Sequence, residues 1–280
     1  MRHQFRAKRR LGQSFLLDPG ILARLAEAAE LSPADTVLEI GPGTGNLTRE
    51  LARRAGAVVA VEIDRELEPL LAETLAEFNN VHLVWGDFLA QDLTRLWELA
   101  PPDPGGTCKV AANLPYYITS PILVKLLTSQ SAPALAVLLV QQEVAERLVA
   151  VPGTRAYGSL SVLVQFYTIP ELVLKVPPRA FFPAPEVSSA AVRLRLRSDP
   201  PVDVQDSALF FQVVRAAFGQ RRKTLINALL GGLEWADKDT LAAALKEAGI
   251  DPTRRGETLS LEEFAALTRA VRSAQADGRR

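Results

Sequence analysis

Short apolar segments alternate with helical segments along this chain as far as residue 196. Seven segments have the composition of buried strands: Val37–Gly41, Ala57–Ile63, Val81–Trp85, Lys109–Asn113, Leu135–Val140, Leu160–Phe166 and Ala190–Leu196. Helical patterns follow the first five, after Thr44, Arg65, Leu93, Ser120 and Gln142. Such alternation predicts an α/β fold in which helices cover both faces of a mostly parallel sheet. No long helix separates the last two segments, so we expect them to form an antiparallel hairpin.

The pattern changes at residues 198–201, where Ser-Asp-Pro-Pro is typical of a linker. Beyond this break the spacing is helical in four segments: Ser207–Phe218, Lys223–Leu230, Lys238–Ala248 and Leu261–Ala274. Ser260 and Glu263 have the spacing of a capping box for the last helix. We therefore predict a basic arm over residues 1–14, an α/β domain over 15–198, a helical domain over 202–274 and a tail over 275–280.

The composition is that of an ordinary soluble protein, with 48% apolar and 23% charged residues. No apolar run is long enough to span a bilayer, and the basic N-terminus lacks the apolar stretch of a secretory signal. The single Cys108 excludes an intramolecular disulfide and a cysteine-based zinc site, and with only 2 histidines besides we expect no metal. We expect a cytoplasmic protein that binds no membrane.

Basic residues gather in two runs although the formal net charge is zero. The first run precedes every acidic residue and includes Arg6, Lys8, Arg9 and Arg10. The second contains Arg221, Arg222 and Lys223, and no carboxylate follows it until Glu234. One such run alone is most simply a solvated face. Two runs in a chain that also carries a base-binding motif, Asn113–Tyr116, described below, favour RNA binding, because phosphate attraction depends on the local field and not on the net charge.

A glycine-rich turn follows the first predicted strand. Gly41, Gly43 and Gly45 lie between that strand and a helix, where glycine permits a tight turn and a close approach of the backbone to a ligand. The G-x-G-x-G spacing is tighter than that of dinucleotide-binding turns, which favours a smaller cofactor without a pyrophosphate. The triplet alone is weak support, because many strand-to-helix turns contain glycines.

Acidic residues at the ends of the next two strands strengthen the prediction of a nucleoside site. Glu62 ends the second strand, where a carboxylate can accept both ribose hydroxyls, and the helix-capping alternative is less favoured. Asp87 follows the third strand and can accept the amino group of an adenine, while Phe88 can line the ring. For Asp87 a simple turn residue is the alternative.

Asn113-Leu114-Pro115-Tyr116 ends the fourth strand and is the most specific motif of the chain. The Asn113 side-chain carbonyl and a main-chain carbonyl at Leu114 can each accept one hydrogen of an exocyclic amino group. That arrangement holds an adenine N6 for in-line attack on a methyl group by positioning and dipoles, without a strong base. Tyr116 offers a ring for the extruded base to stack on. Phe181, in a proline-stiffened loop, can close the other face of the base, although a core phenylalanine is the plainer interpretation.

The chain resembles the ribosomal RNA adenine dimethyltransferases in five segments: Leu11–Leu16, Glu39–Gly45, Asn113–Tyr116, Phe181–Ser188 and Phe218–Leu225. The likeness covers nearly the whole chain and is nearest to the bacterial small-subunit branch of that family. It implies a Rossmann-like seven-stranded S-adenosylmethionine-dependent methyltransferase fold followed by a small all-α domain. It also implies dimethylation of N6 on two adjacent adenosines near the 3′ end of 16S rRNA, late in assembly of the 30S subunit, by a protein that we expect to be a monomer.

The resemblance also implies roles for individual residues. It implies that the methyl donor is contacted by Gln13, Gly41, Glu62, Asp87 and Asn113. We expect further contacts to the donor from Ser14, Leu16, Gly43, Gly45, Ile63 and Phe88. For the target adenine, the expected contacts are Asn113, Leu114, Tyr116 and Phe181. The chain departs from the family at Ser14, where asparagine is frequent, and at Phe182-Pro183, where the loop differs from its usual form.

Three other functions stay open from the sequence. An erythromycin-resistance type of enzyme would modify 23S rRNA, but the segment around Arg221–Lys223 favours the small subunit. A non-catalytic ribosome-assembly factor would bind RNA only, and it would have no need of the acceptor pair at Asn113. A DNA adenine methyltransferase is disfavoured because such enzymes generally carry aspartate at that position, so we expect no DNA partner.

Overall fold

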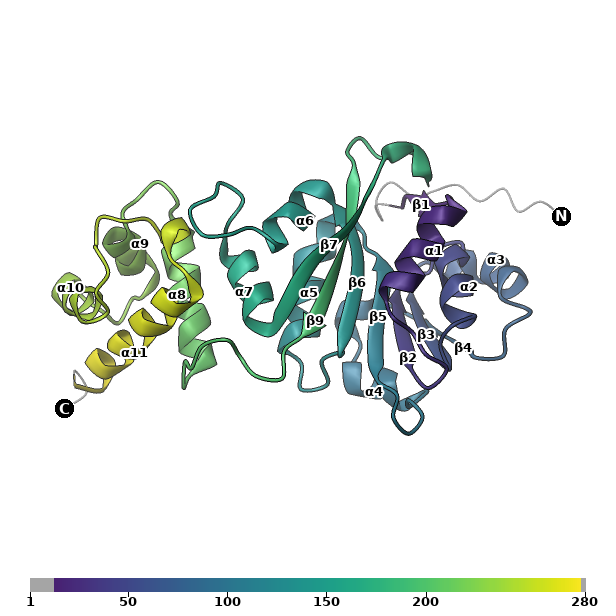
Figure 1. Ribbon diagram of the computed structural model, residues 1–280, viewed down its shortest axis with the longest axis horizontal. Helices are drawn as coiled ribbons and strands as arrows, with labels where there is room; N and C mark the ends of the chain where they lie inside the picture. The colour runs from purple at the N-terminus through teal and green to yellow at the C-terminus, as the bar shows by residue number, and fades with distance from the viewer. Residues whose placement is uncertain (1–12, 278–280) are drawn as a thin grey trace. The chain divides into compact units, whose positions relative to one another are not determined.

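Figure 1 shows the computed structural model of the protein, of which residues 13–277 are described. The chain divides into two compact units. The first unit consists of the chain up to Ala145 together with Thr168–Leu196. The second unit consists of Glu146–Tyr167 together with the chain from Arg197 on. The first of the two predicted RNA-binding runs lies outside the described residues: Arg6, Lys8, Arg9 and Arg10. Within residues 13–277 no helix combines the length and the apolar character needed to cross a membrane.

A seven-stranded sheet forms the centre of the first unit, in the order β4-β3-β2-β5-β6-β9-β7. Its strands are β2 (Thr36–Ile40), β3 (Ala57–Glu62), β4 (Val81–Trp85), β5 (Cys108–Asn113), β6 (Leu135–Gln141), β7 (Thr168–Val176) and β9 (Ser189–Leu196). The five strands from β4 to β6 run parallel, whereas β9 is antiparallel to both β6 and β7. The mostly parallel sheet with an antiparallel end is therefore confirmed.

Helices bury both faces of this sheet. They are α1 (Pro19–Ala28), α2 (Asn46–Ala52), α3 (Glu68–Thr74), α4 (Leu93–Glu98) and α5 (Thr119–Thr128). Val37 and Leu38 point to opposite faces of β2, as neighbours in a strand must, yet both side chains have no exposed area. Leu25 of α1 and Leu51 of α2 pack in the same apolar cluster as Val37. Asp18 starts α1 by accepting a hydrogen bond from the Ile21 amide at 3.1 Å.

One predicted strand is wrong. Leu160–Phe166 lies in a helix, α7 (Ser159–Tyr167), and the expected strand follows it as β7. A short apolar run fits a buried helix as well as a buried strand, and here Val162 and Phe166 share one helical face in the core of the second unit. Ser161 secures the start of the helix, since its hydroxyl accepts from the Gly158 amide at 3.0 Å.

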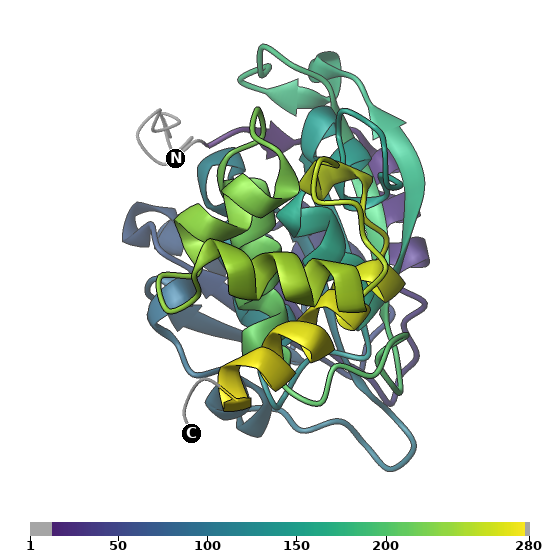
Figure 2. The same ribbon diagram turned by 90° about the vertical axis from the view of Figure 1, so that its left-hand side faces the viewer.

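The second unit is helical. Besides α7 and the last residues of α6 (Gln142–Leu148), it contains α8 (Ser207–Gly219), α9 (Leu225–Gly232), α10 (Lys238–Glu247) and α11 (Leu261–Asp277), drawn in green to yellow in Figure 2. The predicted capping box is confirmed, with Ser260 and Glu263 exchanging backbone-to-side-chain hydrogen bonds of 2.9 and 3.3 Å. Helices α8 and α9 approach so closely that a side chain on Gly232 would meet Ala216 at 2.5 Å.

Candidate active site

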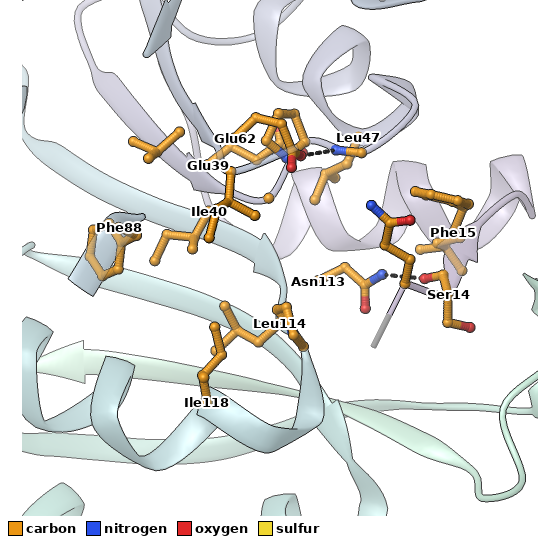
Figure 3. A pocket seen from close by; sticks show the side chains of 18 of the residues that line it. Ser14, Phe15, Glu39, Ile40, Leu47, Glu62, Phe88, Asn113, Leu114 and Ile118 are labelled. Atoms are coloured by element: carbon orange, nitrogen blue, oxygen red, sulfur yellow. Dashed lines mark hydrogen bonds between the residues drawn. The ribbon is translucent and has the colours of Figure 1, made fainter. Parts of the chain in front are cut away.

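A cavity of about 200 Å³ opens where several parallel strands of the first unit end. Its walls come from the carboxyl ends of β2, β3, β4 and β5 and from a segment near the N-terminus, residues 13–16, which we call the strap. Figure 3 shows the cavity with Glu62, Phe88 and Asn113 projecting from different elements around it. Ligands of open α/β sheets bind outside the carboxyl ends of the strands, so this is the place where a bound nucleoside is expected.

The glycine turn forms one wall of the cavity. Gly41 and Gly43 both line it and both have positive φ, at 72° and 57°. A Cβ atom on Gly43 would lie 2.8 Å from the Phe15 ring of the strap, so only glycine lets these two segments approach. Gly45 has a φ of 80° and precedes α2, but it does not line the cavity. Two of the three glycines thus lie at the predicted place.

Glu62 ends β3 with a buried carboxylate directed at the glycine turn. Its Oε2 accepts a hydrogen bond from the Gly43 amide at 3.1 Å, drawn in Figure 3, and its Oε1 accepts from the Asp64 amide at 2.8 Å. Burial raises the pKa of this carboxyl above its ordinary value. A carboxylate has about four acceptor sites, so Glu62 retains capacity for ligand hydroxyls.

Glu39 is a second buried acid that lines the cavity, and its role was not predicted from the sequence. It is 1% exposed, and among the described residues its Oε2 has no hydrogen-bond partner. Burial raises its pKa to about 8, and the charge of Glu62 adds to the shift. A positively charged ligand would favour the ionised form of both carboxyls, which burial disfavours. Two buried acids in the cavity wall therefore fit a cationic nucleoside such as S-adenosylmethionine better than an anionic nucleotide.

The raised pKa of Glu39 makes the stability of the free protein depend on pH. Between its ordinary pKa of 4.5 and its folded-state pKa of about 8, the folded state holds more protons than the unfolded state. The free energy of unfolding contributed by this group therefore falls as pH rises through that window, by at most about 1.4 kcal/mol per pH unit. We expect Glu39→Gln to remove this component of the decline, as measured by thermal unfolding of both proteins from about pH 5 to 8. Parallel curves for the two proteins would contradict the assignment.

The strap is tied to the rest of the cavity by several hydrogen bonds. Gln13 donates from Nε2 to Asp64 at 2.9 Å, and the Ser14 hydroxyl donates to the Pro183 carbonyl at 2.7 Å. Strand β1 (Phe15–Leu16) pairs antiparallel with β8 (Phe181–Phe182). Gln13, Ser14 and Leu16 all line the cavity, as the expected donor site requires.

Asn113 lies at the end of β5 with its amide fixed by the strap. Its Nδ2 donates to the Ser14 carbonyl at 3.0 Å, so that Oδ1 points away from the strap (Figure 3). A flipped amide would set two oxygens against each other, and the backbone of Ser14 therefore determines which atom is left to accept a hydrogen bond. Leu114 follows, 2% exposed, with its amide bonded to the Leu139 carbonyl at 3.0 Å.

Two tyrosines follow in the same turn and differ in exposure. Tyr116 is partly buried, and its hydroxyl shares a hydrogen bond of 2.7 Å with the Ser189 hydroxyl. Burial raises the pKa of Tyr116, which keeps the phenol neutral. Tyr117 is 60% exposed and also lines the cavity. Its position at the mouth was not foreseen, although its place beside Tyr116 in the sequence was a signal for it.

Asp87, Phe88 and Ile63, the remaining residues expected to contact the methyl donor, also line the cavity. Asp87 lines the cavity and also acts as a turn residue, because its Oδ1 accepts from the Leu89 amide at 2.8 Å. Phe88 is 4% exposed and presents a ring to the cavity, and Ile63 adds a half-exposed apolar side chain. Both interpretations of Asp87 therefore describe its position.

The structure does not bring Phe181 into the cavity. Its ring is 5% exposed and packs in the apolar cluster that contains Leu16, its partner in the β1–β8 pair. Phe182, the next residue, is 67% exposed. Neighbouring side chains of a strand point to opposite faces, so the pairing of β8 with the strap sends one ring inward and the other outward. The expectation that Phe181 faces the target base is not supported by this geometry.

The second basic run also differs from a simple charged surface. Arg221 donates to the Arg155 carbonyl at 2.7 Å and to the Tyr157 carbonyl at 3.3 Å, and its Nε lies 3.4 Å from Glu257. It thus holds the loop before α7. Arg222 and Lys223 are exposed in the turn between α8 and α9.

Comparison with known proteins identifies the family. Residues 4–270 match the family model described as ribosomal RNA adenine dimethylase. The chain belongs to this family. Curated members named ribosomal RNA small subunit methyltransferase A include one from Moorella thermoacetica, 55% identical over 93% of this chain and 91% of the relative, and one from Geobacillus sp., 49% identical over 96% and 93%.

Two solved structures of methyltransferases are similar over nearly the whole chain. A dimethyladenosine transferase from Plasmodium falciparum has a TM-score of 0.78 at 26% identity, covering 93% of this chain and 98% of that one. The 23S rRNA methyltransferase ErmE has a TM-score of 0.68 at 32% identity, covering 92% and 99%. The Rossmann-like fold with a helical C-terminal part and the methyltransferase activity of the family are thus established for this chain.

Proposed function

We propose that this protein transfers methyl groups to N6 of two adjacent adenosines near the 3′ end of 16S rRNA, giving N6,N6-dimethyladenosine, in the assembling 30S subunit in the cytoplasm. One observation carries the proposal. The Asn113–Tyr116 turn, which can hold an amino-bearing base, lies in the same cavity as Glu62, which can hold a ribose. The methyl donor is S-adenosylmethionine, which supplies an electrophilic methyl group on a sulfonium when it is bound.

Different residues of the first unit bind different parts of the methyl donor. Glu62 accepts hydrogen bonds from the ribose hydroxyls of the donor, and Asp87 accepts one from its adenine amino group. Phe88 and Ile63 line the adenine ring. Glu39 can form a hydrogen bond to the ligand, since its buried Oε2 has no hydrogen-bond partner among residues 13–277. The strap and Asn113 complete the site.

The target-side residues act by orientation. Oδ1 of Asn113 and the main-chain carbonyl of Leu114 each accept one hydrogen of the target N6, which directs its lone pair toward the methyl group. Fixed dipoles of this kind are effective because they are already aligned before the reaction. No side chain has to remove a proton before transfer, because the methylated amino group is acidic enough to release its proton to water afterwards.

The choice of the small subunit rests on the curated relatives and not on the fold. Relatives at 55% and 49% identity are small-subunit enzymes by name, whereas ErmE, a 23S rRNA enzyme, has the same architecture at 32% identity. The test is to incubate the protein with labelled S-adenosylmethionine and undermodified small subunits, large subunits or DNA. We expect label only in small subunits, on adenosine N6. Label in large subunits would favour the erythromycin-resistance type.

RNA binding is expected to depend on salt through the exposed pair Arg222 and Lys223. Replacing both with glutamine should flatten the slope of log affinity against log salt by about 0.7 for each RNA phosphate that the variant no longer neutralises. Lys238→Gln with Lys246→Gln on α10 is the matched control, since it removes the same charge from another part of the unit. Arg221 is left intact because it holds the loop before α7. An unchanged slope in the first variant would show that this turn is only a solvated surface.

A further inference from the structure

The hydroxyl of Tyr116 has a partner from a distant part of the chain. Tyr116 lies in the turn that follows β5, and Ser189, which shares its 2.7 Å hydrogen bond, is 73 residues away. Ser189 has no exposed area and is the first residue of β9. In the sheet it stands between Gln141 of β6 and Val176 of β7, so strands on both sides fix its position.

The hydrogen bond restrains the orientation of the Tyr116 ring and does not change how its face stacks on a base. A phenylalanine ring stacks on a base as well as a tyrosine ring, so the hydroxyl adds nothing to the stacking face itself. Burial raises the pKa of Tyr116, and the pair is therefore a neutral hydrogen bond between two hydroxyls. What the bond fixes is the far end of the ring, and with it the plane that the ring presents to the cavity.

Ser189 also follows the loop that joins β7 to β9. The loop runs from the end of β7 to the start of β9 and includes β8, which pairs with the strap. The residue before Ser189 is held as well, because the Ser188 carbonyl accepts from the Gln142 amide at 3.0 Å. The buried Ser189 hydroxyl thus connects the Asn113–Tyr116 turn to the start of β9.

We propose that Ser189 is a positioning residue for methyl transfer, and that its hydroxyl acts through Tyr116 by setting the plane on which the target base stacks. The proposal rests on the proposed function only in that a flipped base enters this cavity. It assigns no contact between Ser189 and the substrate. Its effect is on the rate of the bound complex and not on the binding of the methyl donor.

A double-mutant cycle tests the proposal, using Ser189→Ala, Tyr116→Phe and the double variant. Single-turnover methylation at saturating donor and saturating RNA particle is measured for each, with whichever particle the wild-type protein labels. We expect each single variant to lose roughly 5- to 12-fold in rate, which corresponds to the loss of one hydrogen bond of about 1–1.5 kcal/mol. The double variant should be no slower than the slower single variant, because both changes remove the same bond.

Other readouts separate positioning from structural damage. Donor affinity by calorimetry should stay within about twofold of wild type in all three variants. Tyr116→Ala, which removes the stacking face as well, should lose clearly more rate than Tyr116→Phe. Multiplicative losses in the double variant, or full activity in Tyr116→Phe, would overturn the proposal, since Ser189 would then act by another route. If wild-type protein labels no RNA particle, the proposed function fails instead.

Discussion

Asn113→Ala is expected to lower the single-turnover rate of methylation by two or more orders of magnitude. The variant removes the Oδ1 acceptor that holds the target N6, and loss of one preorganised dipole in an active site has effects of about 100- to 1,000-fold. Affinity for the RNA particle should hardly change, because phosphate contacts dominate it. Single-turnover kinetics beside equilibrium binding of the particle distinguishes the two effects.

Asn113→Asp is the informative companion variant. It keeps an acceptor oxygen of the same size but replaces the Nδ2 donor, which now bonds the Ser14 carbonyl at 3.0 Å, with a second oxygen. Two oxygens would then face each other, so we expect a rate close to that of Asn113→Ala. A near-normal rate in Asn113→Ala would remove the catalytic interpretation and favour the RNA-binding assembly factor.

Glu62→Ala is expected to weaken binding of S-adenosylmethionine by roughly 10- to 150-fold, measured by calorimetry on the free protein. The variant loses charge-assisted hydrogen bonds to the ribose, together worth about 1.5–3 kcal/mol. It also releases the Gly43 amide, which donates to Glu62 at 3.1 Å, and so loosens the glycine turn. The two losses act in the same direction.

Glu68→Ala provides the matched control, because Glu68 is an exposed acid at the start of α3 that does not line the cavity. It removes the same charge and should leave donor affinity unchanged. Unchanged affinity in Glu62→Ala would show that the ribose lies elsewhere in the cavity.

Much of the site could be predicted because parallel strands bring their carboxyl ends to one edge of a sheet. Gly41, Glu62, Asp87 and Asn113 each follow or end a predicted strand, and the structure places all four around one cavity. Local sequence was sufficient here, since the strand pattern fixes where each segment ends and the parallel arrangement collects those ends.

Other features depended on contacts that no local pattern contains. The sequence presents Phe181 and Phe182 as equivalent, and only the pairing of β8 with the strap decides which ring is buried. Arg221 and Arg222 are adjacent and alike in sequence, yet only Arg221 is directed at the main-chain carbonyls of another loop. In each case the deciding partner lies more than 60 residues away along the chain.

The sequence by itself determined the strand-and-helix order of most of the first unit, the glycine turn and the family, because these follow from apolar periodicity and contiguous motifs. The tertiary structure alone decided that Leu160–Phe166 is helical, since a short apolar run takes whichever conformation its neighbours can bury. It also decided that Glu39 is a buried acid in the cavity wall, that the Ser14 carbonyl orients Asn113, and that Ser189 holds Tyr116. These features depend on contacts between segments that are distant in the sequence. The burial, pKa and orientation of such a side chain are set by its spatial neighbours and not by its neighbours along the chain.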